Sequence, residues 1–147
     1  MSACIAVSNL NKKHRINERF VRDIAKRILK ALKKDDAKLE IVFLSDAAIK
    51  RVNEKYKHSD KATDVLSFEL GSCGQVLISS DMAISNSRVW STTPEKELIL
   101  YVIHGMLHLF GYDDKKIRDR SRMSRKQDSI LEMLCANISL SKVLTRR

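Results

Sequence analysis

The stretch that decides the fold is residues 93–114, which read TPEKELILYVIHGMLHLFGYDD. It opens with a hydroxyl that can cap a helix, a proline that fits the first turn, and acidic residues near the positive end of the helix dipole. An apolar segment follows and ends at Gly111, because glycine readily adopts the left-handed conformation that terminates helices. The pattern predicts a helix from about Pro94 to Phe110.

Two histidines on this helix indicate a metal site. His104 and His108 are four residues apart, so both imidazoles lie on one face, one turn from each other. After the turn at Gly111, Asp114 can fold back as a third ligand. Such a set suits zinc and leaves one position open for a water molecule, which can ionise near pH ~7. We therefore predict one zinc ion held by His104, His108 and Asp114 and used for hydrolysis.

The same spacing occurs in the metzincin pattern H-E-x-x-H-x-x-G-x-x-H, but Gly105 stands where that pattern has its general-base glutamate. The spacing favours a metal, and Gly105 argues against proteolysis. Two alternatives stay open. The histidine pair can be structural, and Asp113 competes with Asp114 as ligand, although an aspartate there also suits a turn.

Hydrophobic periodicity divides the rest of the chain into short strands and helices. Strands are expected over residues 3–8, 38–45, 65–70 and 75–79, with a turn at 71–74. Further helices are expected from Ile16 to Leu32, from a cap at Asp46 to Tyr56, over 81–90 and over 117–135. Strands and helices alternate with one hairpin between them, so the expected fold class is α+β, a small mixed sheet packed against helices. No linker interrupts the sequence, and we expect residues 1–147 to form a single domain.

The chain is basic, with a net charge of +10 and a pI near 9.7. Basic proteins often bind RNA or DNA, although a basic surface also occurs without a partner. Cys4, Cys73 and Cys135 are odd in number and form no CxxC pair, which fits a reducing cytoplasm. No apolar run reaches the length of a membrane span, and no signal-peptide pattern is present. We expect a cytoplasmic protein that does not bind membranes.

A second informative segment is residues 53–68, NEKYKHSDKATDVLSF, a polar loop that runs into a strand. Thr63 and Asp64 suit a turn. Lys57, His58 and Lys61 could contact phosphate, and as exposed charges they could equally have no partner.

Together the two segments resemble the YbeY family of bacterial endoribonucleases, the ribosomal RNA maturation factors. Where the family has H-G-x-L-H-L-x-G-Y-D-H, this chain has HGMLHLFGYDD. Where it has Y-R-x-x-D-K-P-T-D-V-L-S-F, this chain has YKHSDKATDVLSF, and GQVLIS is similar to its G-D-I-V-I-S segment. The matches run in the same order from about Asn53 to Glu132, over more than half of the chain.

The resemblance implies a zincin-like metal-binding helix and one zinc ion per chain, with His104, His108 and Asp114 at the ligand positions. It also implies cleavage of single-stranded RNA in small-subunit ribosomal RNA maturation and ribosome quality control, in the cytoplasm. The expected partners are ribosomal RNA and the small ribosomal subunit, with no DNA.

The chain departs from the family at two site positions. Asp114 replaces the third histidine, and a carboxylate ligand should make zinc a weaker Lewis acid. Lys57 replaces an arginine implicated in RNA binding or catalysis; it keeps the charge but loses the bidentate fork. We predict that Lys57 neutralises charge on the scissile phosphate.

The densest basic run, residues 115–126, adds a candidate RNA surface. Arg118, Arg122 and Arg125 share one helix face and, with Lys61, are predicted to bind RNA; the alternative is a solvated face. Two rival functions stay open. One is a non-catalytic ribosome assembly factor with a structural zinc, and the other is a metal-dependent hydrolase of another substrate, against which Gly105 and the positive charge weigh.

Overall fold

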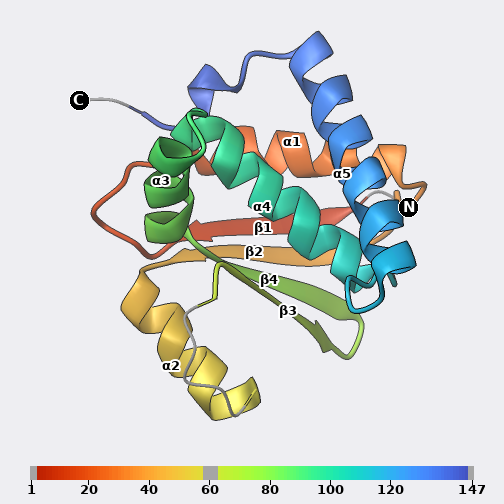
Figure 1. The fold of residues 1–147 in the computed structure, drawn as a ribbon, viewed down its shortest axis with the longest axis horizontal. Coiled ribbons are helices and arrows are strands. Elements are labelled where there is room, and N and C mark those ends of the chain that lie inside the picture. Colours follow the sequence, from red (N-terminus) through yellow and green to blue (C-terminus); the bar gives the residue numbers. More distant parts are fainter. Residues whose placement is uncertain (1–2, 58–62, 146–147) are drawn as a thin grey trace.

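The computed structural model describes residues 3–57 and 63–145, which form a four-stranded sheet and five α-helices (Figure 1). The strands are β1 (Cys4–Asn9), β2 (Lys38–Leu44), β3 (Val65–Leu70) and β4 (Cys73–Ser79). The helices are α1 (Glu18–Ala31), α2 (Asp46–Lys57), α3 (Ser80–Val89), α4 (Pro94–Leu109) and α5 (Ile117–Asn137), with a short 3₁₀ helix η1 (Leu140–Lys142) near the end.

The strand order is β1-β2-β4-β3, with β1, β2 and β4 parallel and β3 antiparallel to β4. The predicted α+β class, mixed sheet and hairpin are therefore confirmed, and β3 is an edge strand. The hairpin turn is shorter than predicted, because β4 begins at Cys73 and leaves only Gly71 and Ser72 between the strands. Gly71 has φ +64°, a conformation that glycine adopts without steric cost.

Three predicted helix starts are wrong by one or two residues; α3 begins at Ser80, one residue before the predicted start. The apolar stripe begins at Ile16, but α1 begins at Glu18 after the cap Asn17, whose side chain accepts from Phe20 N at 3.1 Å. Ile16 is buried in the core cluster but lies outside the helix, where it pairs with Leu144 in an isolated β-bridge, so the apolar stripe indicated burial and not the start of the helix. The cap of α2 is Ser45, whose Oγ accepts from Ala48 N at 3.2 Å, and Asp46 is already helical.

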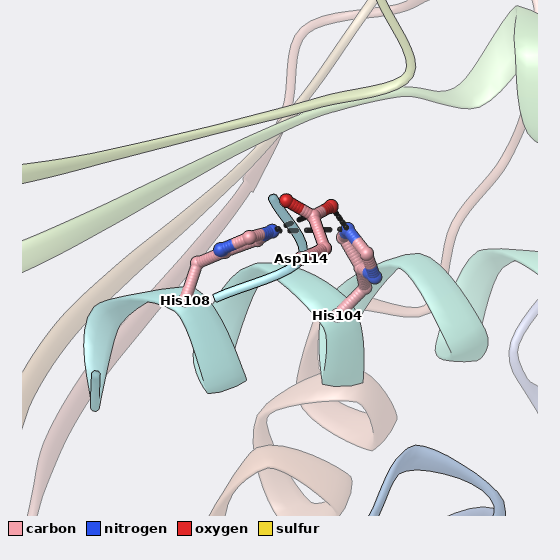
Figure 2. Close-up of side chains that lie close together, drawn as sticks. All are labelled: His104, His108 and Asp114. Atoms are coloured by element: carbon pink, nitrogen blue, oxygen red, sulfur yellow. Dashed lines mark hydrogen bonds and ion pairs between the residues drawn. The ribbon is translucent and has the colours of Figure 1, made fainter. Parts of the chain in front are cut away.

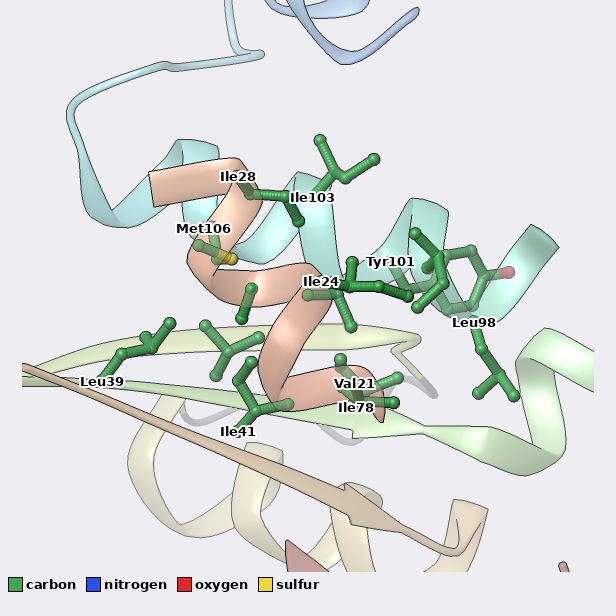
Figure 3. Packing of buried hydrophobic residues seen from close by; sticks show 14 of the residues in the cluster. Val21, Ile24, Ile28, Leu39, Ile41, Ile78, Leu98, Tyr101, Ile103 and Met106 are labelled. Carbon is green, nitrogen blue, oxygen red and sulfur yellow. The ribbon is translucent and has the colours of Figure 1, made fainter. Parts of the chain in front are cut away.

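The core lies mainly on one face of the sheet (Figures 1 and 3). Alternate residues of β2 point to opposite faces: Ile41 and Phe43 join the large cluster under α1 and α4, whereas Val42 joins a small cluster under α2. Helix α4 packs between the sheet and α5 and supplies the most buried side chains. Although α4 is apolar, no helix in the described ranges is long and apolar enough to cross a bilayer.

Gly105 lets α4 lie directly against the β3–β4 hairpin. A Cβ at this position would overlap Val76 Cγ1 and stand 2.9 Å from Val65 Cγ1. At the same point Ser67 Oγ of β3 donates a hydrogen bond of 2.8 Å to the Gly105 carbonyl. Gly105, which stands where the metzincin pattern has a glutamate, is thus required by packing. The structure leaves no room for a side chain at this position.

Gly105→Ala should lower the free energy of unfolding by about 1–3 kcal/mol, because overpacking between two β-branched side chains exceeds the gain in helix propensity. Urea unfolding measures this change. Gly74→Ala is the matched control and should cost less, since its Cβ would meet only the flexible end of Leu109, at 2.7 Å. A Gly105→Ala protein as stable as the parent would contradict the close packing.

Candidate metal centre

The structure brings His104, His108 and Asp114 together at the C-terminal end of α4 (Figure 2). The two rings come from successive turns, and their Nε2 atoms lie 3.2 Å apart. Gly111, with φ +94°, turns the chain after the helix as predicted. Asp114 Oδ2 then lies 3.5 Å from His108 Nε2 and 3.9 Å from His104 Nε2. One donor atom from each residue lies within 4.8 Å of the others, so the group could hold a metal ion.

The outer nitrogen of each ring is bonded to a hydrogen-bond acceptor. His104 Nδ1 is 3.0 Å from Gln127 Oε1 of α5, and His108 Nδ1 is 3.1 Å from the Tyr112 carbonyl. The Tyr112 carbonyl can only accept, so His108 Nδ1 carries the proton, and Gln127 Oε1 as placed favours the same tautomer for His104; each Nε2 is then left to bind a metal. This is the protonation state that a metal ligand requires.

The donor set fits zinc. Two imidazole nitrogens and one carboxylate oxygen are ordinary zinc ligands, and three protein ligands leave a position open. The side chains of His104, His108 and Asp114 are 33%, 28% and 45% exposed, so the open position can be reached from solvent. Together they would carry one negative charge into the coordination shell.

The structure separates the two aspartates that spacing left open. Asp113 Oδ1 accepts from Asp114 N at 2.7 Å and from Lys115 N at 3.1 Å, which is the local turn role expected of aspartate. Asp114, not Asp113, belongs to the group that could hold a metal ion.

A pocket of about 380 Å³ opens between the group and the edge strand β3. Besides the three candidate ligands, its polar lining includes Thr63, Asp64, Ser67 and Glu69. Thr63 Oγ1 donates to Val65 O at 3.3 Å, and the Asp64 carbonyl accepts from Ser79 N at 2.8 Å. The Asp64 bond continues the antiparallel pairing of β3 with β4, so the chain bends at Asp64 directly into the strand and does not form a hydrogen-bonded turn there. Both residues also border the pocket, which the sequence pattern did not indicate.

A smaller pocket of about 250 Å³ lies on the α5 side of His104. Its lining includes Arg120, Ser124 and Gln127, none of which was selected from the sequence. Each of them lies two residues after a member of the predicted arginine row. Because two residues turn an α-helix by about 200°, these three side chains lie on the opposite face of α5 from the row.

The predicted row, Arg118, Arg122 and Arg125, is exposed and faces away from this pocket. The Arg122 guanidinium lies 5.0 Å from the centre of the Tyr112 ring. Lys61 and His58 lie outside the described residues. Helix α2 ends at Lys57, but the described residues do not include the side chain of Lys57.

Fold and site define the class of protein: a mixed α+β domain with a zincin-like helix that presents two histidines and a following aspartate beside an edge strand. The family model of the endoribonuclease YbeY matches residues 6–135. The chain belongs to the YbeY family, as the sequence motifs predicted.

Individual relatives agree with this assignment. The chain is 33% identical to the endoribonuclease YbeY of Geobacter metallireducens, over 88% of this chain and 95% of the relative. It is 31% identical to that of Finegoldia magna, over 87% and 92% of the two chains. The solution structure of TM1509 from Thermotoga maritima aligns with a TM-score of 0.64 at 28% identity and covers 87% of each chain.

Asp114→Ala should weaken zinc binding strongly, because it removes the only carboxylate of the group, whereas Asp113→Ala should change it little. Calorimetric titration with Zn²⁺ compares the two variants with the parent. The reverse ranking would assign the third ligand to Asp113.

Gln127→Ala should weaken zinc binding by about 10- to 100-fold, because His104 loses the acceptor that fixes its tautomer and ring orientation. The same titration measures the effect. Asp128→Ala, the exposed next residue on α5, is the control and should bind zinc like the parent. Unchanged zinc affinity in Gln127→Ala would mean that this contact does not support the metal site.

Proposed function

We propose that this chain is a zinc-dependent endoribonuclease that cuts single-stranded RNA in small-subunit ribosomal RNA maturation and ribosome quality control. On this proposal the whole chain is one catalytic domain, it works in the cytoplasm, and its partners are ribosomal RNA and the small ribosomal subunit. The observation that carries the proposal is the pair of oriented Nε2 atoms with Asp114, open to a pocket, in a member of the YbeY family.

Each part of the site has a role in this reaction. His104, His108 and Asp114 hold the metal, and Gln127 and the Tyr112 carbonyl fix the two rings. Bound there, zinc supplies a Lewis acid that polarises a phosphoryl oxygen and lowers the pKa of water.

Proton transfer and charge neutralisation fall to other residues. Asp64 and Glu69 line the same pocket and supply carboxylates that can accept a proton from water or from a ribose hydroxyl. We assign to Lys57 the neutralisation of charge on the scissile phosphate.

The geometry weighs against a structural zinc and against a peptidase of the metzincin type. A structural zinc usually has four protein ligands in a closed shell, whereas this group offers three beside a pocket of about 380 Å³. A peptidase of the metzincin type needs a glutamate at position 105, and the packing against Val65 and Val76 excludes that side chain.

We also propose that Lys61 and the row of Arg118, Arg122 and Arg125 bind RNA outside the site. The row is exposed along one face of α5, so it can follow a phosphate backbone, and its residues are not in the described lining of either pocket beside the metal group. On this proposal the arginine row increases the affinity for RNA and takes no part in the cleavage step.

The parent should cleave an end-labelled single-stranded RNA, and a chelator should abolish cleavage until zinc is restored. His108→Ala, purified in parallel, is the control for contaminating nucleases and should stay inactive with zinc. Lys57→Ala should cut about tenfold or more slowly at unchanged zinc content, while Lys55→Ala should match the parent. Equal cleavage by the parent and His108→Ala would refute the proposal. A 2′,3′-cyclic phosphate on the product would identify the ribose hydroxyl as nucleophile.

A further inference from the structure

The pocket on the α5 side of His104 is lined by three hydrogen-bond donors from one helix face. Arg120, Ser124 and Gln127 are spaced by four and three residues, so their side chains project in the same direction. Met123 of α5, His104 and Asp114 complete the lining. Any group held by the three donors would therefore adjoin the metal group directly.

These donors are available to a ligand. Gln127 accepts the hydrogen bond from His104 Nδ1 through its Oε1. The amide NH₂ group of Gln127 is therefore left to donate to another group. Among the described residues, neither the Arg120 guanidinium nor the Ser124 hydroxyl takes part in an ion pair or side-chain hydrogen bond. Asp114 lines the same pocket, yet its Oδ2 lies 3.5 and 3.9 Å from the Nε2 atoms of His108 and His104 and, within the part of the chain that the structure describes, forms no ion pair with Arg120.

The pocket on the β3 side has the opposite character. Asp64 and Glu69 line it, and its described lining contains no lysine or arginine. Carboxylates repel a phosphodiester and suit the neutral, donor-bearing parts of a nucleotide. Asp114 lines both pockets, but only the α5 side adds a positive charge, Arg120, to the described lining, so an RNA phosphate beside His104 finds its counter-charge there.

We infer that Arg120, Ser124 and Gln127 form a phosphate-binding site that holds an RNA phosphate beside His104. The guanidinium supplies the charge and up to two parallel hydrogen bonds, and the hydroxyl and amide supply neutral ones. This inference rests on the proposed function, since it names the part of the site that holds the substrate's phosphate. It also differs from the exposed row of Arg118, Arg122 and Arg125, which faces away from the metal group.

The test measures RNA binding apart from cleavage. A fluorescent single-stranded RNA is titrated with protein in chelator at several salt concentrations, and the same variants are then assayed for cleavage with zinc. Arg120→Gln should bind about tenfold more weakly and reduce the slope of log affinity against log salt by about 0.7, the value for one phosphate contact on a single strand. Ser124→Ala should weaken binding a few-fold without changing the slope. Zinc content should match the parent in both.

Lys126→Gln removes the same charge from α5 outside the pocket and is the matched control. Parent-like binding in this control together with the loss in Arg120→Gln supports the phosphate site. Equal affinity for Arg120→Gln and the parent, or equal losses in Arg120→Gln and Lys126→Gln, overturns it. A parent that binds RNA but never cleaves it contradicts the proposed function alone, because the binding comparison still decides the inference.

Discussion

The contact on which the site depends is the approach of α4 to the β3–β4 hairpin at Gly105. Without a side chain there, the helix backbone reaches the strands, and the bond from Ser67 Oγ to the Gly105 carbonyl ties it to the edge strand. Since His104 and His108 flank this point on the same helix, the contact also fixes how far both rings stand from β3. The β3-side pocket, and the carboxylates that line it, follow from this one helix–sheet distance.

The metal group could be predicted from the sequence because it is almost entirely local. Helix pitch places His104 beside His108, and one glycine in the left-handed conformation returns the chain to Asp114, all within eleven residues. Spacing alone could not choose between Asp113 and Asp114, because both can reach the rings. The choice depends on which carboxylate bonds to the backbone of the turn, and that is a matter of three-dimensional geometry.

The parts that could not be predicted depend on packing between distant segments. Gln127 is 23 residues from His104 and reaches it only because α5 packs on α4. The helical period showed that Arg118, Arg122 and Arg125 share a face, but it could not show that the opposite face, with Arg120, is the one turned to the metal group. Ile16 was placed in a helix for a similar reason. An apolar residue that is buried outside a helix, here beside a bridge to Leu144, fits the sequence periodicity as well as one on a helix face.

Asp114 and Gln127 are best understood as a pair. A carboxylate ligand would lower the net charge of a zinc ion with its ligands from +2 to +1 and so weaken the ion as a Lewis acid. A second carboxylate as the acceptor for His104 would make that ring a stronger donor and weaken the metal further. The neutral amide of Gln127 orients His104 with the same hydrogen-bond geometry and adds no further negative charge. With zinc bound at the proposed site, the chain would combine a charged ligand with an uncharged supporting residue, which would limit the loss of Lewis acidity caused by Asp114.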